Sequence, residues 1–321
     1  MPLLDSAYQA PFGFANGYVQ SIYPTLFRRL PTEHLQRQSI ELDDGDFLDL
    51  DWSRGFGDQL VIVSHGLEGH SRRPYVLGVM RQANRQGLDA LSWNFRGCSG
   101  RPNRLPRSYH SGATEDLAAV IQCARQQGYQ AIHLVGFSMG GNLSLLHAGR
   151  DSLDAAVRSV VAFSVPCDLR SSAEQLAKRR NRVFMWRFLR DLQRKMSDKA
   201  QRFPELVSVE RYHQIRTFKQ FDDRYTAPLH GFEDAHDYWQ QSSCVHHLKN
   251  IRVPALLVNA KDDPFLAKAC YPTEIARASR YLHLEQPRYG GHVGFVTRST
   301  DQTYWMEQRA LAFIQAVNSG Q

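Results

Sequence analysis

From residue 60 onward, short runs of β-branched and apolar residues alternate with helical sequence, and this alternation restricts the fold more than any other feature of the chain. Runs of this kind predict buried strands over residues 60–63, 90–95, 131–137, 159–165, 255–260 and 281–286. Helical patterns predict helices over residues 75–86, 114–127 (with Thr114 as its N-cap) and 299–317, and from residue 141. Strands that alternate with helices pair in parallel through right-handed crossovers. The expected fold is therefore α/β, a mostly parallel, twisted sheet with helices on both faces.

Two segments interrupt this alternation. Residues 38–52 predict an antiparallel hairpin at one edge of the sheet, because two short alternating runs flank the turn sequence Asp43-Asp44-Gly45-Asp46. Between residues 169 and 250 no convincing strand pattern occurs, so this stretch is expected to be a helical cap inserted between two strands. The chain is predicted to consist of an N-terminal segment (1–34), an α/β core (35–169 and 251–321) and a helical cap insertion (170–250).

The cysteine pattern and the N-terminal sequence bear on the compartment. The chain has five cysteines, an odd number, which are widely spaced and include no CxxC pair. This pattern favours a reducing environment over a disulfide framework or a zinc site. No apolar stretch approaches the roughly 18 residues that suggest a spanning helix, and the first residues lack the basic and apolar regions of a signal peptide. The expected location is cytoplasmic.

The net charge of +7 is concentrated in one segment. Residues 170–202 contain eight Arg and three Lys against three acidic residues, whereas the rest of the chain is close to neutral. Within the segment, Met185, Leu189, Leu192 and Met196 have helical spacing and predict an amphipathic helix. Its basic face indicates either an ordinary solvated surface or a peripheral contact of this basic cap with an anionic membrane. No nucleic-acid-binding motif accompanies the charge, so nucleic acid is not expected as a partner.

The sequence Gly136-Phe137-Ser138-Met139-Gly140 matches the pattern GxSxG and lies between a predicted strand and a predicted helix. This setting is typical of a nucleophile elbow, a tight turn that exposes a serine at the carboxyl end of a sheet. Glycines are needed there because the turn is strained and leaves little room for Cβ atoms beside the nucleophile. Ser138 is therefore the predicted nucleophile.

A serine hydroxyl needs a general base, and that base needs an acid to orient it. His292 lies in a glycine-rich loop after the last predicted strand, which makes it the predicted base. Asp263 follows the strand predicted over 255–260 and is the predicted acid. Asp262 beside it, and Asp168 after the preceding strand, are the alternatives.

Acyl transfer also needs hydrogen-bond donors for the oxyanion that develops on the carbonyl oxygen. The predicted donors are the backbone N–H groups of Met139, directly after the nucleophile, and of Leu67, in the loop after an early strand. His65, Glu68 and His70 in the same loop lack the spacing of a zinc motif, so no metal is expected and we assign these residues to shaping the loop.

Six segments of the sequence resemble the YheT-like branch of the α/β-hydrolase superfamily, which also includes eukaryotic abhydrolase-domain lipid esterases. They are HGLEG (65–69), NFRGCSGRPNRLPRSYHSGATEDL (94–117), GFSMGGN (136–142), FDDRYTAPLHGF (221–232), NAKDDPF (259–265) and GGHVGF (290–295). The resemblance covers residues 35–315, although members often have Leu where this chain has Met139. It implies an α/β-hydrolase fold, hydrolysis of acyl esters and a triad of Ser138, Asp263 and His292.

Charged residues within these segments have expected roles of their own. We expect Arg96, Arg101, Arg104 and Arg107 to anchor the cap or to meet an anionic group of the substrate. The FDDRYTAPLHGF segment mixes acidic residues with Arg224 and is expected to form a buried ionic hinge between cap and core.

The expected function is that of a serine hydrolase that cleaves carboxylic esters through an acyl-enzyme, without a cofactor. Phe184, Trp186 and Phe188 in the cap suggest a pocket for the acyl chain, so small-molecule esters with short to medium chains are the expected substrates. One alternative is an alcohol O-acyltransferase that uses the same triad, because the two reactions differ in the access of water after acylation. The other is a non-catalytic protein that binds lipid or a membrane surface.

Overall fold

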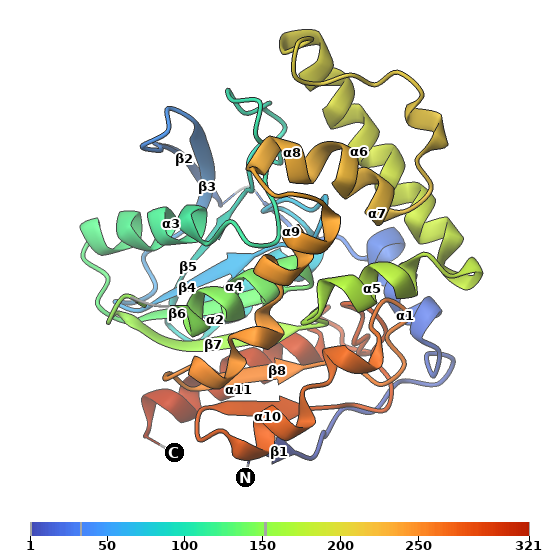
Figure 1. Ribbon diagram of the computed structural model, residues 1–321. Coiled ribbons are helices and arrows are strands. Elements are labelled where there is room, and N and C mark those ends of the chain that lie inside the picture. Colours follow the sequence, from blue (N-terminus) through green and yellow to red (C-terminus); the bar gives the residue numbers. More distant parts are fainter. Residues whose placement is uncertain (1, 33, 151–152, 321) are drawn as a thin grey trace.

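The computed structural model describes residues 2–32, 34–150 and 153–320, and in this part of the chain nine strands form one sheet (Figure 1). The predicted N-terminal segment and α/β core also include residues 1, 33, 151, 152 and 321, which lie outside the described residues. The strands are β1 (Leu3–Leu4), β2 (Gln36–Glu41), β3 (Phe47–Ser53), β4 (Leu60–Ser64), β5 (Asp89–Trp93), β6 (Ile132–Phe137), β7 (Val157–Phe163), β8 (Ala255–Val258) and β9 (Leu282–Glu285). Their order across the sheet is β1-β9-β8-β7-β6-β4-β5-β3-β2. All neighbours from β1 to β5 are parallel, and β3 is antiparallel to both β5 and β2. The predicted parallel sheet with a hairpin at one edge is confirmed.

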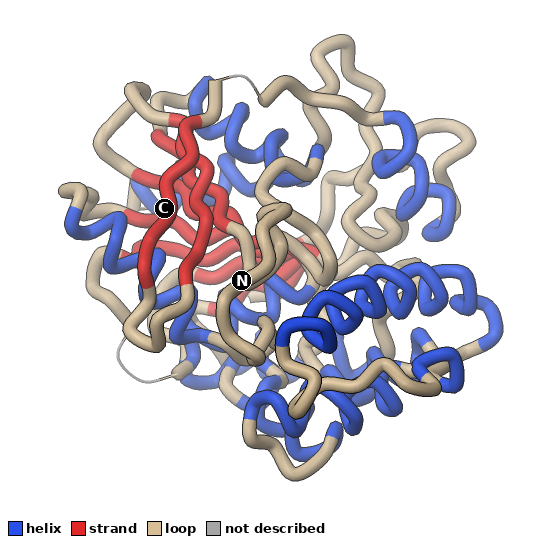
Figure 2. The backbone as a smooth tube through the Cα atoms, turned by 90° about the horizontal axis from the view of Figure 1, so that it is seen from above, coloured by secondary structure: helices blue, strands red, loops and turns tan. Residues whose placement is uncertain are grey.

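Helices cover both faces of this sheet, as predicted (Figure 2). One face carries α2 (Pro74–Arg85) and α11 (Trp305–Asn318), and the other carries α3 (Thr114–Gln126), α4 (Met139–Gly149) and α10 (Thr273–Ala278). Successive residues of a strand point to opposite faces, so Ile62 packs in one apolar layer while Val61 and Val63 pack in the other. The central strands are therefore apolar on both sides, which explains their continuous apolar runs.

The structure differs from the sequence prediction at several helix starts. Helix α1 (Gly17–Phe27) and strand β1 lie in the N-terminal segment, where the sequence predicted no element. The Asn16 side chain caps α1 by accepting hydrogen bonds from two backbone N–H groups. Thr114 is not the N-cap of α3, because Ala113 occupies that position and the Thr114 hydroxyl accepts a hydrogen bond from Arg150 instead. Helix α11 begins at Trp305 rather than at residue 299.

Five α-helices lie between β7 and β8 in the chain. They are α5 (Leu169–Leu176), α6 (Arg182–Arg202), α7 (Phe218–Phe221), α8 (Ala227–His230) and α9 (Ala235–Ser242). The predicted apolar stripe of α6 is buried and packs against aromatic residues that include Tyr212, Phe221 and Phe265. Among the described residues, no helix is long and apolar enough to cross a membrane.

The four arginines expected to anchor the cap bind the edge hairpin and its surroundings instead. Arg96 is buried and forms ion pairs with Asp116 (2.7 Å), Asp44 (2.7 Å) and Asp46 (3.2 Å). The other three pair in the same region: Arg101 with Asp49, Arg104 with Glu41, and Arg107 with Glu115 and Asp44. Each arginine thus finds an acid from the hairpin or from the start of α3, so the expectation of a cap anchor was wrong for these side chains.

Basic residues of α6 make the attachment instead, two of them to the loop after β5. The Lys199 ammonium group donates hydrogen bonds to Asn103 Oδ1 (2.9 Å) and to the carbonyl oxygens of Leu105 (2.9 Å) and Arg107 (3.1 Å). Arg202 donates to the carbonyl oxygen of Asn103 at 2.7 Å. The inserted helices are therefore held to the loop after β5 by hydrogen bonds to backbone carbonyls, and part of the basic charge of α6 points inward.

Replacing Arg96 by Met should lower the free energy of unfolding by about 3–5 kcal/mol, because Asp116 and Asp46 would stay buried without their positive partner. Urea denaturation at neutral pH measures this change. Arg104→Met is the matched control, since Arg104 and Glu41 form an exposed pair and should contribute far less. Equal effects of the two substitutions would contradict the role of Arg96 as the buried centre of this cluster.

Candidate active site

Ser138 occupies the turn between β6 and α4 in a strained backbone conformation. Its φ of 53° and ψ of −119° lie in a region that L-residues rarely adopt. A Cβ atom at Gly136 would lie 2.4 Å from the carbonyl oxygen of Gly140, and one at Gly140 would lie 2.4 Å from that of His65. Only glycine fits at these two positions, which is why the GxSxG pattern can make this turn.

The structure brings Ser138, His292 and Asp263 together in one hydrogen-bonded chain. His292 Nε2 lies 2.9 Å from Ser138 Oγ, and His292 Nδ1 lies 2.9 Å from Asp263 Oδ2. The Asp263 carboxylate is buried and also accepts a hydrogen bond from the N–H of Phe265. The spacing allows a proton to move from Ser138 to His292 while Asp263 holds the imidazole in place.

The two alternative acids lie elsewhere. Asp262 Oδ1 accepts a hydrogen bond from the N–H of Gly291 (2.9 Å) and so supports the loop that carries His292. Asp168 caps α5, where it accepts a hydrogen bond from the N–H of Ser171 at 2.7 Å. Neither has a described hydrogen bond to His292.

Helix α1 also supports the His292 loop, and the sequence analysis missed this contact. The hydroxyl of Ser21 accepts a hydrogen bond from the N–H of His292 (2.8 Å). A Cβ atom at Gly291, whose φ is 57°, would lie 2.4 Å from the carbonyl oxygen of Gly17. Asn16 before Gly17 is an N-cap signal that could have predicted the helix, but nothing in the sequence pairs residue 21 with residue 292.

The loop 65–69, which we call the oxyanion loop, is held from two sides. The N–H of Gly66 donates to the Tyr75 hydroxyl (3.0 Å), and that of Glu68 donates to the Tyr109 hydroxyl (3.1 Å). The Glu68 carboxylate in turn pairs with Lys195 of α6 at 3.0 Å. Within the described residues, no acceptor takes the N–H of Leu67 or of Met139. Both predicted oxyanion donors are thus unengaged beside Ser138.

His65 contributes to the shape of this loop. Its Nε2 accepts a hydrogen bond from the N–H of Phe95 (3.2 Å), and its Nδ1 lies 2.7 Å from the carbonyl oxygen of Gly66. Burial lowers the pKa of His65 to about 3, so the ring is neutral at physiological pH. The neutral ring can therefore accept from the loop after β5 through Nε2 and donate to the carbonyl oxygen of Gly66 in its own loop through Nδ1.

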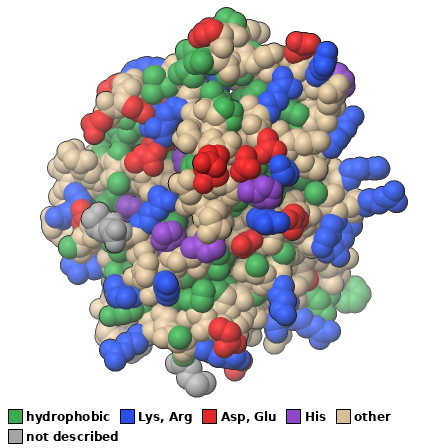
Figure 3. All heavy atoms as spheres, viewed as in Figure 1, with side chains coloured by type: hydrophobic (Ala, Val, Ile, Leu, Met, Phe, Trp, Pro, Cys, Tyr) green, Lys and Arg blue, Asp and Glu red, His purple; other side chains and the backbone are tan. Residues whose placement is uncertain are grey.

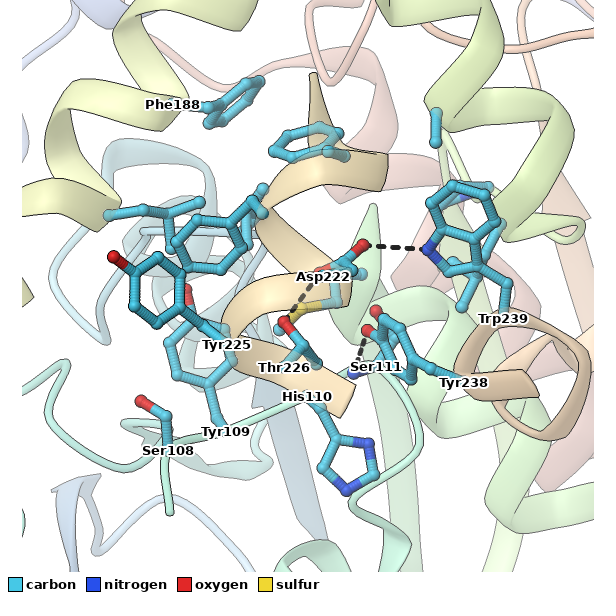
Figure 4. A pocket seen from close by; sticks show the side chains of 18 of the residues that line it. Ser108, Tyr109, His110, Ser111, Phe188, Asp222, Tyr225, Thr226, Tyr238 and Trp239 are labelled. Atoms are coloured by element: carbon cyan, nitrogen blue, oxygen red, sulfur yellow. Dashed lines mark hydrogen bonds between the residues drawn. The ribbon is translucent and has the colours of Figure 1, made fainter. Parts of the chain in front are cut away.

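An apolar cavity of about 130 Å³ is lined by Ser138, by His292 and by residues of the inserted helices. Figure 4 shows part of this lining. Most of its walls are apolar or aromatic, including Met139, Leu192, Phe188, Phe221 and Tyr225. Of the three predicted aromatic residues, Phe188 lines this cavity. Phe184 and Trp186 do not, and Trp186 is 59% exposed. A cavity of this composition can hold an acyl chain.

Asp222 is the one carboxylate among the described residues that line the apolar cavity. Its carboxylate accepts hydrogen bonds from the Thr226 hydroxyl (2.6 Å) and from Trp239 Nε1 (2.9 Å), as Figure 4 shows. Burial raises the pKa of Asp222 to about 7. Arg224 points away and donates to backbone carbonyls of residues 208 and 210. The expected ionic hinge between cap and core was therefore wrong, because Asp222 is held by neutral donors within the inserted helices.

A second cavity, of about 390 Å³, also reaches Ser138 and His292. Its walls come from α1, the oxyanion loop, the start of α2 and the first half of α6. Four arginines line it: Arg29, Arg72, Arg73 and Arg187. We call it the basic cavity.

Residues 60–304 match the alpha/beta hydrolase family. The chain belongs to this family. It is 34% identical to "Putative esterase YheT" of Escherichia coli K12 over 92% of this chain and 89% of that protein. It is 26% identical to human "Phospholipase ABHD3" over 98% of this chain and 80% of that protein. The resemblance inferred from the sequence is confirmed.

A solved structure gives the same fold. The esterase Pf2001 of Pyrococcus furiosus superimposes with a TM-score of 0.61 over 97% of this chain and 100% of that chain, at 14% identity. This likeness confirms the α/β-hydrolase architecture, and together the relatives confirm the predicted enzyme class, a carboxylic ester hydrolase.

Proposed function

We propose that this α/β hydrolase cleaves carboxylic esters through Ser138, His292 and Asp263. The supporting observation is the hydrogen-bonded chain from the Ser138 hydroxyl through the His292 ring to the buried Asp263 carboxylate. Three groups far apart in the sequence meet within hydrogen-bond distance at the carboxyl edge of the sheet. This arrangement is the one that activates a serine for attack on an acyl carbon.

The reaction proceeds in two halves. Ser138 Oγ bonds to the acyl carbon while His292 takes its proton, and the N–H groups of Leu67 and Met139 stabilise the negative carbonyl oxygen. His292 then gives that proton to the leaving alcohol, and the acyl group remains on Ser138. A water molecule, deprotonated by His292, attacks the acyl-enzyme; the carboxylic acid leaves and the proton returns to Ser138.

We propose that the acyl chain occupies the apolar cavity and that residues 170–250 act as the cap over it. Helix α6 lines the cavity with Phe188, Leu192 and Met196, and these side chains replace water around the chain. The polar group at Asp222 interrupts the apolar wall and limits the apolar length available. Esters with short to medium acyl chains are therefore the proposed substrates.

We further propose a peripheral contact with anionic membranes. Large apolar side chains are exposed on α1, where Leu26 is 54% and Phe27 66% exposed, and at the start of α6, where Val183 is 71% exposed. Arg182 and Arg187 are exposed on the same turns of α6 as Val183. Figure 3 shows basic side chains along the edge of the molecule that α6 forms. An exposed apolar patch rimmed by cations suits the interface of an anionic bilayer.

Ser138→Ala should lower kcat on p-nitrophenyl butyrate on the order of 10⁴–10⁶-fold, because the attacking group is removed. Asp263→Asn should lower it about 10⁴-fold, because His292 is no longer held in the productive tautomer. Asp262→Asn is the matched control: it keeps an acceptor oxygen for Gly291 and should cost far less. Initial rates test this, and full activity of Ser138→Ala or an equal loss in both Asp variants would contradict the assignment.

Ala173→Phe should move the preferred acyl length toward shorter chains, because Ala173 lines the apolar cavity and packs beside Trp239. The measurement is kcat/KM over a series of p-nitrophenyl esters from acetate to palmitate. Ala177→Phe, at the exposed C-cap of the same helix, is the control and should keep the native profile. A native profile that does not vary with chain length would refute the acyl role of this cavity.

The combined variant Phe27→Ser and Val183→Ser should bind anionic vesicles at least ~10-fold more weakly, because it removes two exposed apolar side chains that would insert into the interface. Sedimentation with phosphatidylserine-containing vesicles measures this binding. Leu206→Ser changes a similarly exposed residue (60%) beyond the other end of α6 and should bind as the native chain does. Equal binding of the native chain to neutral and anionic vesicles would overturn the electrostatic part of this proposal.

A further inference from the structure

The basic cavity differs from the apolar cavity in both its walls and its exposure. Both reach Ser138 and His292, and Phe188 and Phe265 line both of them. Only the basic cavity includes Val293, next to the proposed base, and exposed residues such as Thr25, Arg29, Arg72 and Arg187. A substrate can therefore reach Ser138 with its two halves in different surroundings, one apolar and one cationic.

The positive charge of the basic cavity is not balanced within it. Its two acids are engaged by other cations: Glu68 pairs with Lys195 at 3.0 Å, and Asp191 pairs with Arg190 (3.0 Å) and Arg194 (3.4 Å). Among the residues that the structure describes, Arg29 and Arg187 have no carboxylate within ion-pair distance.

The other two arginines of the basic cavity are only partly engaged. Arg72 contacts Asp51 at 3.3 Å with a side chain that is 41% exposed, and Arg73 donates to the backbone carbonyl of Glu68. His70 also lines the basic cavity. Burial and the nearby Arg73 and Arg72 lower the pKa of His70 to about 4, which agrees with an excess of positive charge there. Unbalanced arginines in a cleft raise the local concentration of anions.

We infer that the basic cavity binds the alcohol half of the ester and that this half carries a phosphate group. The inference rests on the proposed function, in which the acyl chain fills the apolar cavity and His292 gives a proton to the leaving alcohol. The basic cavity is the second described space that reaches His292, so it is assigned to the alcohol. Arginine recognises phosphate through paired N–H groups and keeps its charge at all physiological pH values. The phosphate can belong to a lipid headgroup or to a dissolved phosphate ester.

The test compares two esters that share one acyl chain and differ in the alcohol. One is the monoacyl ester of glycerol, and the other is the monoacyl ester of glycerol phosphate. The native chain should show a kcat/KM at least ~10-fold higher for the phosphate ester, since one charge-assisted hydrogen bond corresponds to that factor or more. The ratio should fall as the salt concentration rises.

Two variants identify the residues responsible. Arg187→Gln and Arg29→Gln should each lower kcat/KM for the phosphate ester about 10-fold, mainly through KM, and leave the neutral ester unchanged. Arg216→Gln is the control, because Arg216 is exposed and lines neither cavity. Its rates on both esters should equal those of the native chain.

Each ester is tested dissolved as a monomer with a short acyl chain and incorporated in vesicles. If the phosphate ester is preferred both as a dissolved monomer and in vesicles, a dissolved phosphate ester is enough for binding. If it is preferred only in vesicles, the phosphate that binds is that of a lipid headgroup. Equal kcat/KM for phosphate and neutral esters in both forms overturns the inference, as does a loss in the Arg variants that is equal for both esters. Failure of the proposed function has a different result, because then neither ester nor p-nitrophenyl butyrate is hydrolysed in a Ser138-dependent way.

Discussion

The backbone strain at Ser138 is the constraint on which the rest of the site depends. A serine with a positive φ between β6 and α4 lies in a strained backbone conformation, which costs free energy. This conformation persists only where the surrounding structure holds it in place. Here β6 is paired on both sides by β4 and β7, and glycines at 136 and 140 allow two backbone segments to approach the turn. This tight turn places Ser138 Oγ at the edge of the sheet, within hydrogen-bond distance of His292.

Parts of the chain outside the sheet hold the partners of Ser138. Helix α1 supports the His292 loop through Ser21, and Lys195 of α6 pairs with Glu68 in the oxyanion loop. The N-terminal segment and the inserted helices are therefore connected to the reacting groups and not only to the surface. The ion pair between Lys195 and Glu68 thus ties the position of α6 to the loop that contains Leu67.

The sequence predicted the features that depend on local residue patterns. It did not predict side-chain contacts that depend on how distant segments pack. Ser138, Asp263 and His292 each follow a predicted strand, so their meeting at one edge follows from parallel pairing. Arg96 was predicted, with three other arginines, to anchor the cap or to meet the substrate. Its ion pairs with Asp116 and Asp46 depend instead on how the hairpin packs. Trp186 and Phe188 are two positions apart on one helix, and only the packing of α6 shows that Phe188 faces the cavity while Trp186 faces solvent.

Labelling with a fluorophosphonate followed by peptide mass mapping tests the central claim most directly, because the reagent bonds only to a serine that a base has activated. The account predicts one adduct, on Ser138, which disappears in Ser138→Ala and slows greatly in His292→Ala. No adduct on Ser138 in the folded native chain, or undiminished labelling of the chain when Ser138 is replaced, would contradict it.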